Sequence, residues 1–110
     1  MTANEITATL LIEIPKRFPR IKLWRNNRID TMAVGRGGNM RRVSAGIDGQ
    51  GDVCGLIGPE GRMIQLEIKA GKDRIRPSQM GFRAMIQNMG GIYLEIRSVE
   101  QGLADLEKLL

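Results

Sequence analysis

Three side chains in the middle of the chain have the types and the spacing to carry out a reaction: Asp52, Glu67 and Lys69. Residues 52–57 and 63–69 each predict a short strand, and the Gly-Pro-Glu-Gly sequence between them is typical of a hairpin turn. If the central Pro-Glu pair forms the tip, Asp52 lies directly opposite Glu67. Cross-strand neighbours have Cβ atoms roughly 5 Å apart. The hairpin should therefore hold two carboxylates side by side, with Lys69 on the same face.

Two adjacent carboxylates repel each other, and a hard divalent cation with oxygen ligands would compensate for that repulsion. We expect Asp52 and Glu67 to bind Mg²⁺ or Mn²⁺, and Lys69 to hold or deprotonate a water beside the metal. An Asp followed by Glu-x-Lys on the next strand is typical of metal-dependent phosphodiester cleavage. The alternative is an exposed hairpin whose Glu-x-Lys face is ordinary surface charge. The matched register and the Gly-x-Gly-Asp sequence before the first strand favour the functional interpretation.

The composition narrows the classes of function. The 110 residues predict one domain with a modest core, and the formal net charge of +5 favours a polyanionic partner. The sequence has no histidine, which excludes His-dependent triads, and one cysteine, which excludes an internal disulfide. A single cysteine also suits a reducing cytosol, and no apolar run is long enough to cross a membrane. We therefore expect a cytoplasmic protein whose chemistry depends on carboxylates, lysine and metal.

Capping residues and hydrophobic periodicity predict the elements that would position the hairpin. Thr2 and Glu5 form a capping box that opens a helix, and Pro77 is well placed to begin another. The expected elements are helices over 5–14, 77–89 and from 99 onward, and strands over 21–24, 52–57, 63–69 and 92–96. The order helix, three strands, helix, strand, helix predicts an α/β fold with a mixed sheet flanked by helices. Residues 28–51 are rich in Gly, Arg and Asn and predict a loop that faces DNA, or else a flexible, solvated connection.

Three segments, in their order along the chain, resemble a known family: GQGDVCGLI, LEIKAGKDRIRPSQ and MGGIYLEIRSVEQGLADL. They are similar to the VRR-NUC (virus-type replication-repair nuclease) domain of the PD-(D/E)XK nuclease superfamily. The upstream LWRNN also fits, so the resemblance covers nearly the whole chain. It implies a PD-(D/E)XK restriction-endonuclease-like core of the order α-β-β-β-α-β-α, spanning residues 1–110. It also implies a metal-dependent DNA endonuclease for branched or Holliday-junction-like DNA, in DNA repair or in a phage-infected bacterial host.

The resemblance suggests roles for further residues. Gln79 matches the glutamine of the family's Pro-x-Gln helix start and would reach the edge of the active site, or it could satisfy backbone groups. The expected core stripe of the same helix is Phe82, Met85, Ile86 and Met89. Glu5 matches the acidic residue of the family's first helix, an accessory metal or water ligand, and its role as a helix cap is an equal alternative. The backbone carbonyl of Ile68 would join the two carboxylates at the metal.

Basic and polar residues on either side of the hairpin are candidates for contact with nucleic acid. The candidates are Arg25, Asn26, Arg36, Arg41, Arg42, Lys72, Arg74 and Arg76. Clustered arginines neutralise phosphates, and neighbouring glycines let the backbone approach a ligand closely. Arg25 and Asn26 could instead order the loop that follows them. Trp24 is expected to be a core or interface residue rather than a platform for base stacking.

Two other functions and two states of assembly stay open at this point. A non-catalytic nucleic-acid-binding domain of the same fold would use the +5 charge equally well, although retention of Asp52, Glu67 and Lys69 favours the enzyme. A pure interaction module would lack a basic face around the hairpin. We expect a homodimer, because seven Met and Trp24 give more apolar surface than a small domain readily buries. A two-fold axis would also place two sites on a junction. The alternative is a monomer whose methionines fill its core.

Overall fold

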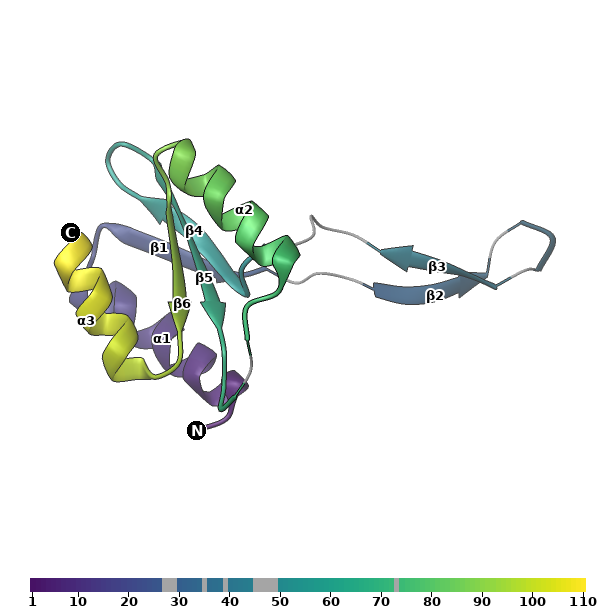
Figure 1. Cartoon of the computed structure of the whole chain (residues 1–110), viewed down its shortest axis with the longest axis horizontal. Helices are drawn as coiled ribbons and strands as arrows, with labels where there is room; N and C mark the ends of the chain where they lie inside the picture. The colour runs from purple at the N-terminus through teal and green to yellow at the C-terminus, as the bar shows by residue number, and fades with distance from the viewer. Residues whose placement is uncertain (27–29, 35, 39, 45–49, 73) are drawn as a thin grey trace.

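A four-stranded mixed sheet forms the centre of the molecule, with helices on both of its faces (Figure 1). The computed structural model describes residues 1–26, 30–34, 36–38, 40–44, 50–72 and 74–110, with the backbone alone at 30–34, 36 and 41–44. In sheet order the strands are β1 (Ile21–Arg25), β4 (Val53–Ile57), β5 (Arg62–Ile68) and β6 (Ile92–Ile96). The helices described are α1 (Ala3–Arg17), α2 (Pro77–Asn88) and α3 (Val99–Leu109). The predicted α/β class with a mixed, helix-flanked sheet is confirmed.

The β4–β5 hairpin has the predicted register. Val53 lies opposite Leu66 and Ile57 opposite Arg62, so the next pair along the ladder is Asp52 and Glu67. The strands β1, β4 and β5 are antiparallel, whereas β6 runs parallel to β5. A parallel neighbour requires a crossover connection, which α2 supplies between β5 and β6. β5 therefore runs between β4 and β6, and Glu67 itself pairs with Glu95 of β6.

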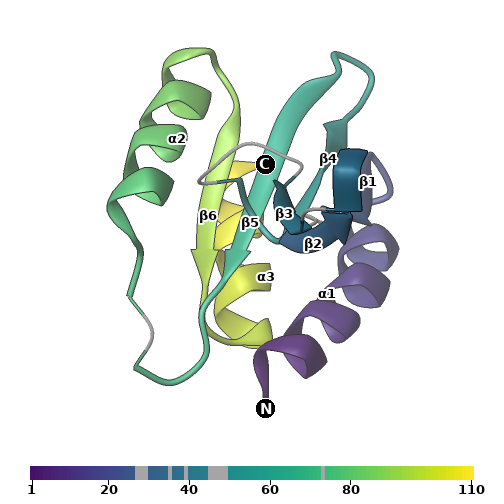
Figure 2. The ribbon, with the colours of Figure 1, turned by 90° about the vertical axis from the view of Figure 1, so that its right-hand side faces the viewer.

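The two faces of the sheet have different cores. On one face α1 and α3 bury the aliphatic residues of all four strands, with Leu10 and Leu106 fully enclosed. On the other face α2 packs over β6 through Phe82 and Ile86, which contact Tyr93 (Figure 2). Because α2 packs chiefly over β6, the apolar stripe that it buries is narrower than predicted. Two members of the expected stripe, Met85 and Met89, are exposed instead.

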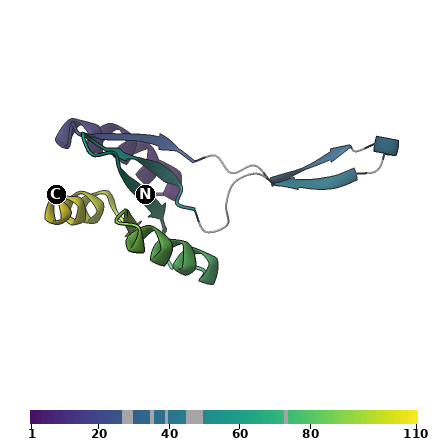
Figure 3. The same ribbon diagram turned by 90° about the horizontal axis from the view of Figure 1, so that it is seen from above.

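A two-stranded ribbon stands apart from this body (Figure 3). It consists of β2 (Asp30–Val34) and β3 (Met40–Ser44), with a turn at Arg36–Gly38 between them in which Gly37 and Gly38 both have a φ of 81°. We call this ribbon the arm. The prediction of a loop over 28–51 is therefore wrong for these residues, since regular pairing replaces irregular backbone. The expected core elements follow the order α-β-β-β-α-β-α, and the arm is inserted between β1 and β4.

Two further expectations need correction. Helix α1 continues through Pro15 to Arg17 instead of ending near the proline. A proline in the last turn removes one backbone hydrogen bond, and the helix still closes through Phe18 N–H, which donates to the Ile14 carbonyl at 2.7 Å. Trp24 is 50 % exposed, so it is not a core residue. None of the helices in the described residues combines the length and the apolar character needed to cross a membrane.

Candidate active site

Asp52 lies at the start of β4, where it is tied to the end of β5. Its Oδ2 accepts a hydrogen bond from the Ile68 N–H at 2.8 Å. This side-chain bond extends the contact between the two strands beyond their ladder, which ends where Val53 pairs with Leu66. The carboxylate is thereby fixed beside β5. Asp52 and Ile68, predicted as partners at a metal, are brought together.

Glu67 is the most constrained carboxylate of the site. Its side chain lies on the α2 face of the sheet and is only 4 % exposed. Oε1 accepts a hydrogen bond from Gln79 Nε2 at 2.7 Å and lies 3.3 Å from Lys69 Nζ. Oε2 is buried, and no donor in the described part of the chain reaches it. Burial raises the pKa of Glu67 and the negative charge of Asp52 raises it further, while Lys69 and Gln79 offset part of that rise.

Lys69 and Gln79 complete a buried polar cluster around Glu67. Lys69 is 9 % exposed, which is unusual for a lysine and is made possible by its ion pair with Glu67. Gln79 lies in the first turn of α2, and its Oε1 accepts a hydrogen bond from the Arg76 N–H at 2.8 Å. One end of Gln79 therefore satisfies backbone, as predicted, and the other reaches Glu67; its place at the edge of an active site stays a prediction. The alternative of an exposed, ordinary Glu-x-Lys face is wrong.

The oxygen atoms of this site suit a hard divalent cation. An unpaired carboxylate oxygen in a buried position is costly unless a proton or a cation satisfies it, and Glu67 Oε2 is such an atom. No group of three or more His, Cys, Asp or Glu that could hold a metal ion occurs among the described residues. Mg²⁺ commonly uses one or two carboxylates together with water and substrate phosphate. Asp52 and Glu67 therefore fit Mg²⁺ or Mn²⁺ as a pair, with the Ile68 carbonyl as the predicted third ligand.

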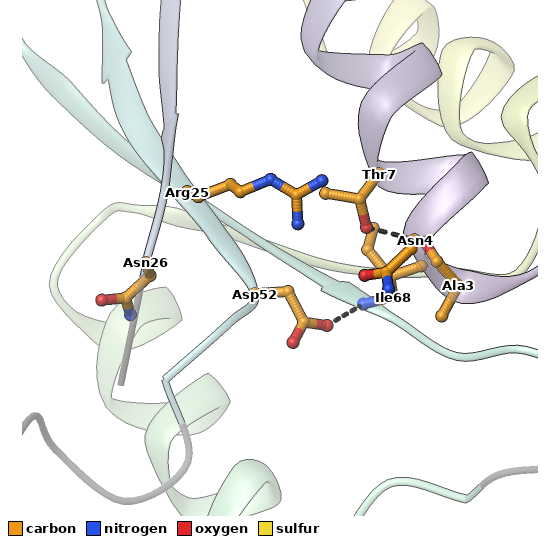
Figure 4. A pocket seen from close by; sticks show the side chains of 7 residues that line it. All are labelled: Ala3, Asn4, Thr7, Arg25, Asn26, Asp52 and Ile68. Carbon is orange, nitrogen blue, oxygen red and sulfur yellow. Dashed lines mark hydrogen bonds between the residues drawn. The ribbon is translucent and has the colours of Figure 1, made fainter. Parts of the chain in front are cut away.

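A cavity of about 360 Å³ opens on the other side of Asp52 (Figure 4). Its lining comes from β1 through Arg25 and Asn26, and from the first turns of α1 through Asn4 and Thr7. Figure 4 shows the Arg25 side chain extending from β1 toward Thr7, above the Asp52 carboxylate. Two residues predicted to contact nucleic acid are thus brought next to the candidate metal site. The sequence analysis missed Asn4 and Thr7, which are small polar residues about one turn apart near the start of α1.

Glu5 is not part of this group. The Thr2 hydroxyl accepts a hydrogen bond from the Glu5 N–H at 3.2 Å and donates one to Glu5 Oε1 at 3.1 Å. The capping interpretation of Glu5 is therefore confirmed, and its role as an accessory ligand stays a prediction. Lys72, Arg74 and Arg76 are exposed in the connection between β5 and α2 and do not line the cavity.

The remaining nucleic-acid candidates belong to the arm. Arg36 lies in its turn, and Arg41 and Arg42 lie on β3. Their side chains are outside the described part of the structure. Their backbone positions place them away from the buried cluster, on an element that projects from the body (Figure 3).

The root of the arm is fixed beside Asp52 by three contacts. The Asn26 N–H donates to the Asp52 carbonyl at 2.9 Å, and Asn26 Nδ2 donates to the Gly51 carbonyl at 3.2 Å. The buried Gln65 side chain accepts a hydrogen bond from the Gly51 N–H at 2.9 Å. A Cβ at Gly51 would lie 2.7 Å from the Leu66 carbonyl oxygen, so the backbone can approach β5 only at a glycine. Asn26 thus ties the end of β1 to Gly51 and Asp52, whereas residues 27–29, which it was predicted to order, lie outside the described residues.

A scan against protein-family models and a search of curated proteins each found no match for this chain. Function therefore has to be inferred from the chemistry of the site. The relevant features are the buried Glu67–Lys69–Gln79 cluster, Asp52 beside it, and the polar cavity that Asp52 shares with β1 and α1.

Proposed function

We propose that this protein is a metal-dependent endonuclease that hydrolyses phosphodiester bonds of DNA. The observation that carries the proposal is the Glu67 carboxylate, which is buried next to Asp52 and Lys69 with one oxygen that no described residue satisfies. A purely structural carboxylate in such a place would be expected to have both oxygens hydrogen-bonded. An arrangement that leaves one oxygen free is suited to a ligand that binds there.

Each residue of the cluster has a distinct part in the proposed reaction. Asp52 and Glu67 would hold Mg²⁺ or Mn²⁺, which supplies Lewis-acid polarisation of the phosphate when it is bound. Lys69 would orient the attacking water through its ammonium group, which is held 3.3 Å from Glu67 Oε1. Gln79 positions Glu67 through the bond to Oε1, and its own position is fixed by the Arg76 N–H.

The substrate class follows from charge and from the resemblance to VRR-NUC domains. The chain has a formal net charge of +5, and Arg25 and Asn26 lie in the cavity beside Asp52, where a phosphate could be held. We propose that the fold is the PD-(D/E)XK core and that the substrate is branched or Holliday-junction-like DNA. The single free Cys54 suits a reaction in a reducing cytosol.

Cleavage of a panel of labelled DNAs tests the proposal directly. The panel contains duplex, flap, single-stranded and four-way-junction DNA, each with EDTA, Mg²⁺ or Mn²⁺. We expect cleavage only with metal, preferentially of branched DNA, and none by Glu67→Gln. Binding of the same DNAs without cleavage under any metal would favour the alternative function, a non-catalytic nucleic-acid-binding domain.

We also propose that two copies act together as a homodimer. On the α2 face, the part of the sheet beyond α2 exposes Trp24 of β1 and the cross-strand pair Leu56 and Met63. Strand alternation and register place all three on one face. Half-exposed Trp, Leu and Met side chains together are typical of a surface that a partner covers. Sedimentation velocity at micromolar concentration without DNA should give the mass of two chains, and Trp24→Ser should shift it toward 12.2 kDa.

A further inference from the structure

The positive charge of the chain is concentrated in and around the arm. Residues 25–44 contain five arginines and one acidic residue, Asp30, which gives this segment a net charge of +4. The five are Arg25, Arg28, Arg36, Arg41 and Arg42. The other 90 residues carry twelve cationic and eleven acidic side chains, a net charge of +1. Three of the five arginines lie in the arm itself, where residues 30–44 carry a net charge of +2. Arg25 lies on β1 of the body, beside the candidate active site.

Within the described residues, no helix or second sheet packs against the arm. β2 and β3 form a sheet of their own, and neither has a substantial contact with another element. An isolated two-stranded hairpin is only marginally stable in water. Its outer edges also present backbone groups that are unpaired within the ribbon. Such an element is expected to gain stability when something covers it.

From these observations we propose that the arm enters the major groove of duplex DNA and supplies most of the affinity for the substrate. A two-stranded ribbon, with strands roughly 4.8 Å apart, is one of the elements that the groove of about 12 Å accommodates. The net charge of +2 on the arm, from three arginines and one aspartate, attracts the phosphates on both walls of the groove. The same charge disfavours pairing of the arm with the arm of a second copy. The inference rests on the proposal that DNA is the substrate.

The root of the arm determines where the bound duplex would lie. The first strand of the arm follows β1, and the second leads back to Gly51 and Asp52. Asn26, at the end of β1, is connected to the returning segment through its bonds to the Asp52 and Gly51 carbonyls. DNA held by the arm would therefore be adjacent to Asp52 and to the cavity that contains Arg25. Capture by the arm and chemistry at the body would act on one and the same duplex.

The register of the arm adds a more specific expectation. Ala33 pairs with Arg41 and Met32 with Arg42, so positions 41 and 42 fall on opposite faces of the ribbon. In a ribbon seated in a groove, one face meets the base edges and the other faces outward. Arg41→Gln and Arg42→Gln should therefore weaken binding to different extents. Charge acting at a distance would make the two substitutions equivalent.

The first test measures affinity for a duplex by fluorescence anisotropy in EDTA, so that no cleavage is needed. Arg41→Gln combined with Arg42→Gln should weaken binding at least 10-fold at 0.1 M salt, on the order expected for two lost phosphate contacts. The slope of log Kd against log salt should fall by about 2. The matched control, Lys16→Gln combined with Lys108→Gln, makes the same charge change at two exposed positions of the body. It should change affinity less than twofold; equal losses in both variants would overturn the inference.

The second test uses the wild-type protein, so it does not depend on the folding of a variant. The duplex is replaced by one containing glucosylated 5-hydroxymethylcytosine, whose sugars occupy the major groove. We expect binding to weaken at least 10-fold, while distamycin in the minor groove has little effect. Undiminished binding to the glucosylated duplex would reject the major-groove site. If the arginine double variant instead halves the mass seen in sedimentation, the arm pairs with a second copy and the inference is wrong.

The outcomes also separate this inference from the proposed nuclease activity. A protein that binds through its arm in EDTA but never cleaves DNA would retain the inference and lose the nuclease. A protein that cleaves with metal and is unaffected by both tests would retain the nuclease and lose the role of the arm.

Discussion

The body and the arm of this protein use opposite designs. In the body, both faces of the sheet are packed, and Glu67, Lys69 and Gln79 are buried and bonded to one another. In the arm, two strands pair only with each other and project from the body with three arginines and a net charge of +2 (Figure 1). Rigid packing is what a group of carboxylates needs to hold a fixed geometry. Reach and charge are what a polyanion-binding element needs.

The difference suggests a division of labour between the two regions. Catalysis would depend on a few buried atoms of the body, and affinity on cations distributed along the arm. The two regions meet at one short joint, formed by Asn26, Gly51 and Asp52. Substitutions in the body, in the arm and at the joint should therefore change different measured quantities, and this expectation can be tested at each place.

The largest effect is expected for the carboxylates of the body. Asp52→Asn or Glu67→Gln should reduce metal-dependent cleavage at least about 10³-fold, as loss of a group that stabilises the transition state through a metal would. The affinity for DNA in EDTA should stay within twofold of wild type, because the arm is unchanged. Single-turnover cleavage and anisotropy measure the two quantities. Wild-type activity in either variant would show that the substituted carboxylate has no part in the reaction.

Lys69→Ala should separate catalysis from metal binding within the body. The rate of cleavage should fall about 10²-fold, in the range for loss of one positioned donor. An ammonium group is not a metal ligand, so Mn²⁺ affinity by calorimetry should not fall as it does in Asp52→Asn. Lys108→Ala, at an exposed position of α3, controls for the change in net charge. Equal loss of Mn²⁺ binding in Lys69→Ala and Asp52→Asn would contradict the assigned role.

A methyl group at the joint should disturb both regions moderately. In Gly51→Ala the new Cβ would lie 2.7 Å from the Leu66 carbonyl oxygen, so β4 has to move away from β5. We expect the free energy of unfolding to fall by about 1–3 kcal/mol, as for other overpacked sites. Gly81→Ala is the matched control: it lies in α2 with open space around it and should gain about 0.5–1 kcal/mol. Urea denaturation measures both changes. An unchanged stability of Gly51→Ala would show that the backbone at the joint can move to admit a methyl group, and the prediction would be wrong.

The smallest effect concerns the two carboxylates without metal. Burial and the charge of Asp52 raise the pKa of Glu67 above its ordinary value of 4.5, so the folded protein holds this proton more tightly than the unfolded chain. The free energy of unfolding in EDTA should therefore fall as the pH rises from 4.5 through the raised pKa. Asp52→Asn removes one cause of the shift, while its side-chain oxygen can still accept the Ile68 N–H.

The Asp52→Asn variant should accordingly be the more stable protein at neutral pH, by about 1 kcal/mol. Thermal unfolding in EDTA at pH 5 and pH 7 provides the measurement. The difference between variant and wild type should appear at pH 7 and become small at pH 5. The same difference at both pH values would mean that Asp52 does not act through the ionisation of Glu67.

Local patterns in the sequence were sufficient to predict the β4–β5 hairpin and its register. The alternation of Ile64, Leu66 and Ile68 with polar residues set the strand and its buried face, and the turn between the strands set the register. A register obtained from a two-residue tip fixes every pair of the hairpin at once. For that reason the proximity of Asp52 and Glu67 could be predicted before the fold was known.

The parts that were not predicted depend on contacts between distant segments. β2 and β3 have mixed polar and apolar residues with glycines at their ends, so no period of two distinguishes them from a loop. The exposure of Met85 and Met89 depends on how much of the sheet α2 covers, which no periodicity specifies. The cavity beside Asp52 needs Asn4 and Arg25 to meet across two elements.

The hydrogen bond from Asn26 to the Asp52 carbonyl has a thermodynamic consequence. A displacement of the arm's root on DNA binding would displace the backbone of a predicted metal ligand. If occupation of the arm changes the affinity of the carboxylates for Mn²⁺ by some factor, then Mn²⁺ must change the affinity for DNA by the same factor. This reciprocity would make the divalent cation an effector of substrate binding as well as a participant in cleavage. It would let a weakly held metal be retained chiefly by protein that already carries its substrate.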